Sequence, residues 1–123
     1  MKRLLRKLLG DRGEQAAARY LRQHGYRILQ RGYRNPFGEV DLIALFERRI
    51  IFIEVKTRSS DRTGQPGEAV DLRKQRKLTR LAMHWLRTHN RLEQAARFDV
   101  ISIFWRDDGP QIQHIPNAFD AVE

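Results

Sequence analysis

The sequence contains no cysteine among its 123 residues. Disulfide bonds, thiolate catalysis and cysteine-based zinc sites are therefore excluded, and the absence fits a reducing cytoplasm. No apolar run approaches the roughly 20 residues that a transmembrane helix needs. Residues 1–9, MKRLLRKLL, lack the apolar core of a secretory signal because basic residues interrupt the pairs of leucines. These absences predict a cytoplasmic protein with no transmembrane segment.

Acidic residues are fewer than basic ones: 15 Asp and Glu stand against 24 Lys and Arg, which gives a net charge of +9. Such a basic chain favours a polyanionic partner, nucleic acid first and an anionic membrane second. The length fits one domain over residues 1–123 with its own core. Residues 1–9 are expected to form a basic N-terminal arm, because so short a segment holds little helix by itself. A short amphipathic helix on a membrane or a phosphate backbone is the alternative.

Two apolar, β-branched segments, residues 38–46 and 50–57, flank the polar residues 47–49. This pattern predicts a β-hairpin. Both segments are apolar on both faces for much of their length, which indicates central strands of a sheet that is covered on both sides. Three charged residues nevertheless lie inside this apolar material: Asp41, Glu54 and Lys56.

Glu54 and Lys56 are two residues apart, so their side chains point to the same face of a strand. A carboxylate in such a strand costs free energy unless a cation or hydrogen-bond donors meet it. Two carboxylates beside a lysine could hold a divalent ion such as Mg²⁺, which prefers oxygen ligands. The alternative is a buried ion pair between Lys56 and one carboxylate. That pair would leave one negative charge over, and a metal ion would remove the excess.

This segment resembles the motif of the PD-(D/E)xK nuclease superfamily: Asp41 is followed by a gap of 12 residues and then by Glu54-Val55-Lys56. The surrounding stretches RNPFGEVDLIALFERRIIFIEVKTR, GQPGEAV, RFDVIS and NAFD are similar to the YraN-like family of bacterial proteins, which has the restriction-endonuclease-like fold. The resemblance extends from about residue 10 to residue 121. It implies an α/β fold with an αβββαβ core, in which helices flank a central mixed sheet.

The same resemblance implies a metal-dependent endonuclease that hydrolyses phosphodiester bonds. Asp41 and Glu54 would bind Mg²⁺ or Mn²⁺, with the Val55 carbonyl as a further ligand. Lys56 would orient or help to deprotonate the attacking water and would stabilise charge on the phosphate. The competing hypothesis is a non-catalytic nucleic-acid-binding module on the same fold, for example one that recognises branched DNA.

Glu14 is the candidate for a third metal ligand. Residues 11–24 are expected to form the first helix, and Gly25 is expected to end it. The sequence GEQAA matches the family's G-E-x-x-A pattern, and in many nucleases of this fold a glutamate on the first helix reaches the metal. Asp11 and Glu14 also resemble a capping box at a helix N-terminus, so the two interpretations of Glu14 stay open.

The rest of the chain adds further elements and a set of candidate phosphate-binding residues. We expect a strand over 26–33, a helix over 68–89, a strand over 97–105 and a short strand over 111–115 that Pro116 ends. Asp99 is expected to bind a basic side chain or a turn. The candidates for phosphate contact are Arg58, Arg62, Arg73, Lys74, Arg76, Lys77 and Arg80.

The small chain has no evident element that reads a base sequence. We therefore expect that dimerisation or a protein partner defines the substrate. DNA is favoured over RNA as the nucleic acid.

Overall fold

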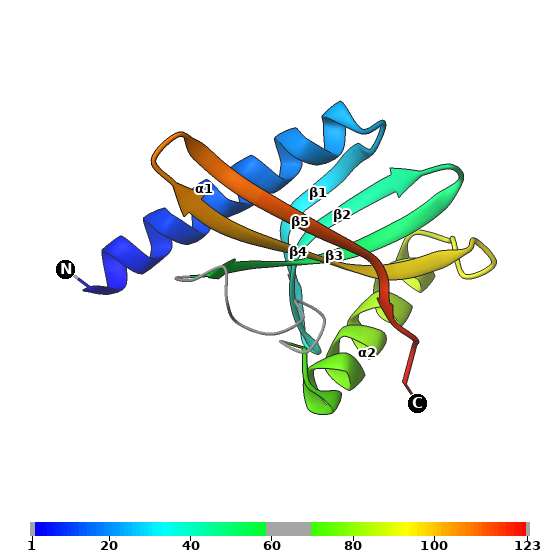
Figure 1. The fold of residues 1–123 in the computed structure, drawn as a ribbon. Coiled ribbons are helices and arrows are strands. Elements are labelled where there is room, and N and C mark those ends of the chain that lie inside the picture. The colour runs from blue at the N-terminus through cyan, green and yellow to red at the C-terminus, as the bar shows by residue number, and fades with distance from the viewer. Residues whose placement is uncertain (1, 59–69, 123) are drawn as a thin grey trace.

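The computed structural model describes residues 2–58 and 70–122. In chain order its elements are α1 (Lys2–Gln23), β1 (Arg27–Asn35), β2 (Gly38–Phe46), β3 (Arg49–Arg58), α2 (Leu72–Thr88), β4 (Ala96–Arg106) and β5 (Gly109–Phe119). This order contains the expected αβββαβ core and adds one strand at its end (Figure 1).

The five strands form one mixed sheet in the order β1-β2-β3-β4-β5. All neighbouring strands are antiparallel except β3 and β4, which are parallel and are joined through α2. A parallel connection needs such a crossover because the chain has to return to the starting end of the sheet. α1 covers one face of the sheet and α2 the other (Figure 1). The expected fold class is therefore confirmed.

Each face of β3 contributes to a different apolar cluster. Ile50 and Phe52 pack with the buried face of α2, whereas Ile51 and Ile53 pack with the buried face of α1. All four side chains are almost completely buried. The prediction that the hairpin strands are covered on both sides is correct, and a charged group in β3 is consequently held among apolar neighbours.

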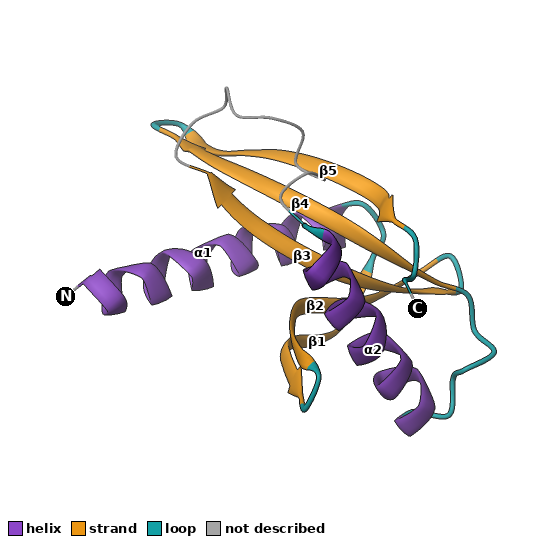
Figure 2. Ribbon diagram, turned by 90° about the horizontal axis from the view of Figure 1, so that it is seen from below, coloured by secondary structure: helices purple, strands orange, loops and turns teal. Residues whose placement is uncertain are grey.

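The first helix begins much earlier than the sequence predicted. α1 starts at Lys2, so the described residues of the expected basic arm are helical, and Figure 2 shows them extending past the sheet. The prediction of an arm was wrong because adding residues to an existing helix costs far less than nucleating a new one. The leucines on these turns, Leu4, Leu5 and Leu8, are more than half exposed. None of the described helices is long and apolar enough to cross a membrane.

The last strand is longer than expected. β5 continues through Pro116 to Phe119, which lies opposite Phe98 of β4. Pro116 was expected to end the strand because proline cannot donate a backbone hydrogen bond. β5 is an edge strand of the sheet, however, and an edge position tolerates proline because the missing N–H can face away from the neighbouring strand.

Candidate active site

Asp41 and Glu54 meet where the β2–β3 ladder ends. The last paired residues of this ladder are Leu42 and Ile53, so Asp41 and Glu54 are the next residue on each strand. Beyond this point the Asp41 side chain replaces the backbone as hydrogen-bond acceptor. Its Oδ2 accepts a hydrogen bond of 2.7 Å from the Val55 backbone N–H. This bond holds the Asp41 carboxylate against the peptide that joins Glu54 to Val55. The structure thus brings the two predicted acids together.

Two lysines converge on one oxygen of Glu54. The Nζ of Lys74 lies 2.6 Å from Glu54 Oε1, and the Nζ of Lys56 lies 3.7 Å from the same atom. Lys74 belongs to the first turn of α2, where Asp71 caps the helix by accepting a hydrogen bond from the Lys74 backbone N–H. The cap fixes the start of α2 and so directs Lys74 towards β3.

Lys74 changes the charge balance that the sequence indicated. With Asp41 and Glu54 ionised, Lys56 and Lys74 together neutralise the cluster. The argument that a single lysine leaves one negative charge over was therefore wrong, because it did not include a second lysine from the helix. Lys74 had been predicted to contact phosphate, and nothing in its spacing from Glu54 revealed the ion pair.

The cluster shifts the pKa of three of its members. Burial, followed by the nearby Glu54 carboxylate, raises the pKa of Asp41 to about 7. Burial and the neighbouring Lys74 ammonium lower the pKa of Lys56. Burial also opposes charge on Lys74, but the hydrogen bond and the charge of Glu54 outweigh it and raise the pKa of Lys74. The ionised form of the Asp41 carboxyl group is thus disfavoured in this environment.

Glu14 of α1 lies within electrostatic range of the cluster. Burial raises the pKa of Glu14, Arg31 lowers it, and Glu54 is among the acids that raise it. α1 approaches β3 closely here, because a Cβ on Gly13 would come within 2.9 Å of the Thr57 hydroxyl. The capping-box interpretation is wrong because α1 continues nine residues before Asp11, starting at Lys2.

A metal site with three acidic ligands is not preassembled in the structure. Within residues 2–58 and 70–122, no group of three His, Asp or Glu side chains is placed to hold an ion. The role of Glu14 as a third ligand remains a prediction, as do the metal-binding roles of Asp41, Glu54 and the Val55 carbonyl.

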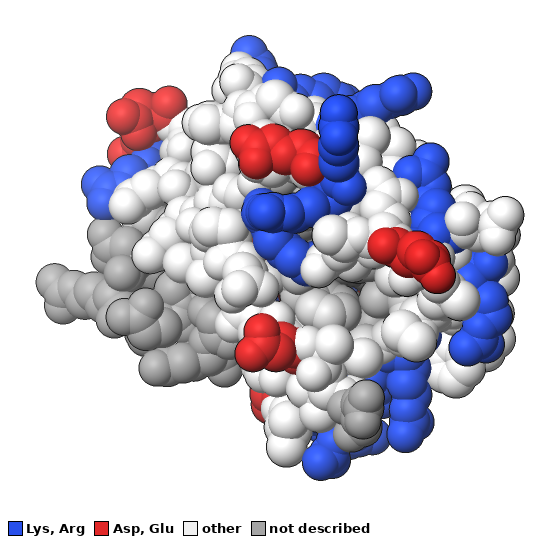
Figure 3. Space-filling model, turned by 90° about the vertical axis from the view of Figure 1, so that its right-hand side faces the viewer, with Lys and Arg blue, Asp and Glu red and all other residues white. Residues whose placement is uncertain are grey.

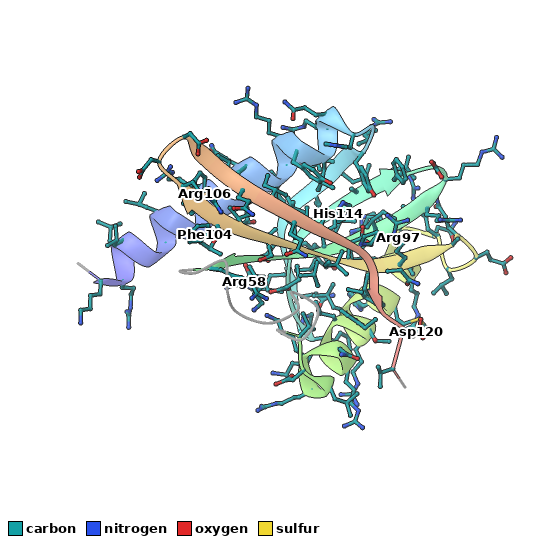
Figure 4. The ribbon with its side chains drawn as sticks, in the orientation of Figure 1. Arg58, Arg97, Phe104, Arg106, His114 and Asp120 are labelled. Carbon is teal, nitrogen blue, oxygen red and sulfur yellow. The ribbon has the colours of Figure 1, made fainter. Side chains whose placement is uncertain are left out.

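The predicted phosphate contacts have different surroundings. Lys77 and Lys74 line a hollow of about 180 Å³ together with Gly38 and Glu39 of β2. Arg58 is half-buried at the end of β3, where Figure 4 labels it, and Arg62 lies outside the described residues. The remaining predicted phosphate contacts on α2 are exposed: Arg73, Arg76 and Arg80. Figure 3, which views the end with the β2–β3 turn, shows acidic side chains lying between basic ones there.

A second buried acid, Asp99 of β4, has a full set of donors. It accepts two hydrogen bonds from Arg97, of 2.8 and 3.0 Å, and one of 3.0 Å from the Asn117 backbone N–H. His114 Nε2 lies 2.7 Å from the same carboxylate, and Figure 4 shows Arg97 and His114 on the adjacent strands β4 and β5. Burial alone would raise the pKa of Asp99, but these hydrogen bonds lower it. The prediction that Asp99 binds a basic side chain is confirmed.

The architecture and the element order define a restriction-endonuclease-like α/β domain. The model of the family described as Uncharacterised protein family UPF0102 matches residues 13–103. The chain therefore belongs to the UPF0102 family, also called the YraN family, and the resemblance drawn from the sequence is confirmed.

Relatives from several bacteria match nearly the whole chain. A UPF0102 protein of Geobacter metallireducens is 47% identical over 114 residues, covering 93% of each chain. One from Trichlorobacter lovleyi is 48% identical and covers 91% of this chain and 90% of its own. One from Caldanaerobacter subterraneus is 40% identical, and the match covers 97% of this chain and 100% of the relative.

Solved structures give a weaker match. The crystal structure of SSO0001 is 20% identical with a TM-score of 0.37, and this chain spans 52% of it. Pyrococcus furiosus SfsA in complex with Ca²⁺ is 16% identical with a TM-score of 0.36, and this chain spans 63% of it. Likenesses at this level carry no conclusion about activity.

Proposed function

We propose that this protein is a metal-dependent nuclease that hydrolyses phosphodiester bonds of nucleic acid, with DNA favoured over RNA. The observation that carries the proposal is the hydrogen bond from the Val55 N–H to Asp41 Oδ2, because it fixes one carboxylate beside the residue that bears the other. Two acids and a lysine at the open end of a hairpin form the arrangement that the PD-(D/E)xK motif requires.

The donor set fits a hard divalent ion. Mg²⁺ is commonly held by one or two carboxylates and keeps several waters, so Asp41 and Glu54 suffice without a third acid. Burial and the neighbouring Glu54 carboxylate raise the pKa of Asp41 to about 7, so a bound cation would stabilise the ionised form of this carboxyl group. Both lysine contacts of Glu54 are made by Oε1, so Oε2 is not engaged by them. In this proposal the Val55 carbonyl is a further ligand, and Glu14 completes the set when substrate binds.

Each residue then has a separate task. When bound, the ion would stabilise negative charge on the phosphate and activate water. Lys56 lies on the same face of β3 as Glu54, where it would orient or help to deprotonate the attacking water and stabilise charge on the phosphate. Lys74 holds the Glu54 side chain in place, and the exposed side chains of Arg73, Arg76 and Arg80 bind neighbouring phosphates.

A non-catalytic nucleic-acid-binding module is the second candidate. The observation in its favour is the second lysine: Lys56 and Lys74 neutralise Asp41 and Glu54 without any added ion. In this case the cluster stabilises the junction between α2 and the sheet, and the basic surface alone binds nucleic acid. Cleavage would then be absent under all metal conditions.

A cleavage panel tests the proposal. Single-stranded, double-stranded and branched DNA, together with RNA, are incubated with Mg²⁺ or Mn²⁺ and the parent, Glu54→Gln or Lys56→Ala protein. We expect the parent to cut at least one substrate, and each variant to lose at least about 100-fold in rate because it lacks a ligand or the lysine. Asp108→Asn, a substitution in the exposed β4–β5 turn, is the matched control.

Three results decide between the two candidates. Cutting that persists in Glu54→Gln protein would contradict the proposal. Binding of the substrates without cutting, with either metal, would favour the non-catalytic module. Sedimentation of the protein with and without substrate tests whether a homodimer assembles on the nucleic acid.

A further inference from the structure

A hollow of about 750 Å³ is lined by residues of α1, by Arg31 of β1 and by residues of the β4–β5 hairpin. Its rim carries four arginines and two aromatic residues: Arg12, Arg19, Arg22, Arg31, Tyr20 and Trp105. Within the described part of the chain, no acidic side chain lines it. We call this hollow the α1 groove. None of its arginines belongs to the set that the sequence singled out for phosphate binding.

The groove gathers four positive charges on one concave surface. Within residues 2–58 and 70–122, none of its four arginines forms an ion pair with a carboxylate. Like charges around one concave surface repel one another, and the same field attracts a polyanion. Elsewhere the chain pairs arginine with acid, as at Arg97 and Asp99. The groove is therefore suited to an anionic ligand.

Trp105 adds an aromatic ring to the lining of the groove, which attraction between charges alone would not require. The indole Nε1 of Trp105 is buried and has no hydrogen-bond partner among the described residues. A buried donor of this kind is uncommon because its lost hydration is not replaced. The Arg12 guanidinium lies over the same ring, 4.3 Å from its centroid. A phosphate that binds Arg12 would therefore lie close to the Trp105 ring.

The length of the groove matches several phosphates of one strand. From Arg12 to Arg22, α1 rises about 15 Å at about 1.5 Å per residue. Phosphates of one strand repeat about every 3.4 Å along a duplex axis and further apart in an extended strand. The three arginines of α1 therefore extend over a length that at least two consecutive phosphates of one strand would cover. Arginines combined with aromatic rings are typical of surfaces that bind single strands, where bases can stack.

We propose that the α1 groove binds a single-stranded segment of nucleic acid, with its arginines on consecutive phosphates and Trp105 beside a base. The inference takes its ligand class from the proposed function. Arg31 joins the two regions, since it lines the groove and also acts electrostatically on Glu14 beside the cluster. The groove thus guides one strand of the substrate towards Asp41 and Glu54 along α1.

Binding measured without catalysis tests this inference. A fluorescein-labelled single-stranded 12-mer is titrated in EDTA into Asp41→Asn protein, and into the same protein with Arg12→Gln and Arg19→Gln added. We expect the added pair to weaken binding at least about tenfold. The dependence of log affinity on log salt concentration should become shallower by about 1.4, since two phosphate contacts are lost. Arg87→Gln with Arg91→Gln removes the same charge from α2 and the loop after it, and should weaken binding no more than about twofold.

Tryptophan emission supplies a second readout. Binding of the strand should quench emission from Asp41→Asn protein, and Trp105→Phe should abolish most of that quenching. Equal losses of affinity in the two arginine pairs, or unchanged emission at saturation, would overturn the inference. Equally tight binding and equal quenching by heparin would overturn the assignment to nucleic acid. Because no metal or turnover is involved, failure of the proposed nuclease activity would leave this result unaffected.

Discussion

Asp41, which is half-buried, and Asp99, which is buried, lie on β2 and β4 of one sheet, yet their environments have opposite effects on their pKa values. Asp99 receives donors from Arg97, His114 and the Asn117 backbone, and its pKa is lowered. Asp41 receives the Val55 N–H and faces Glu54, and its pKa is raised to about 7. An acid whose charge is fully compensated stabilises the fold. An acid whose charge is poorly compensated lowers stability when ionised, and such an acid is a candidate for binding a cation.

The largest expected effect is at Asp99. Asp99→Ala leaves the Arg97 guanidinium without its carboxylate in a mostly buried position and should lower the free energy of unfolding by about 3 kcal/mol. Urea unfolding at pH 7 measures the change. Asp107→Ala, an exposed acid in the turn after β4, is the control and should change stability by less than about 0.5 kcal/mol. A similarly small change for Asp99→Ala would contradict the claim that the compensated Asp99 carboxylate stabilises the fold.

The opposite sign is expected at Asp41. Its pKa in the folded protein, about 7, lies above the usual value near 3.9 in the unfolded chain, so the folded state binds more protons between those values. The parent therefore loses stability as the pH rises from about 4 to 7. Asp41→Asn avoids this loss and should stabilise the protein at pH 8 by on the order of 2 kcal/mol, with little effect at pH 4.

Urea unfolding at both pH values tests the sign at Asp41. Asp99 should behave in the reverse sense: its lowered pKa contributes stability above about pH 4 that is lost as the pH falls further. Destabilisation by Asp41→Asn at pH 8 would show that the ionised carboxylate is well compensated, and the comparison would fail.

The smallest expected effect concerns Lys74. Its ammonium occupies Glu54 Oε1 and competes with any added cation. Lys74→Met should therefore raise the affinity for Mn²⁺ about fivefold, which is about 1 kcal/mol. Lys77→Met is the control: it removes the same charge about one turn further along α2, from a side chain that lines the same hollow as Lys74. Equal gains in both variants would indicate a long-range charge effect only, and weaker binding in Lys74→Met would contradict the competition.

Local sequence patterns predicted much of the fold and three residues of the charged cluster, Asp41, Glu54 and Lys56. The unbroken apolar run Ile50, Ile51, Phe52 and Ile53 indicated that β3 is a central strand, and the i, i+2 spacing placed Glu54 and Lys56 on one face. Contacts between distant elements were not predictable in this way. A single sequence does not show which direction a helical side chain takes, so the ion pair between Lys74 and Glu54 was missed.

Two further features were missed for the same reason. His114 reaches Asp99 only because β5 pairs with β4, and an alternating strand pattern does not reveal which pairs meet. The α1 groove forms where α1 crosses the β4–β5 hairpin, so its arginines share no sequence motif. In each case the tertiary arrangement, which local periodicity does not encode, decides the contact.

Calorimetric titration with Mn²⁺ at pH 7 tests the central claim most directly. The titration is repeated in two buffers with different heats of ionisation, on parent and Asp41→Asn protein. A cation that binds between Asp41 and Glu54 must displace the proton that Asp41 retains in part at this pH, so the parent should release a measurable fraction of a proton per ion. Asp41→Asn protein should bind weakly and release none. Absence of binding to the parent, or equal binding to both proteins, would contradict the claim.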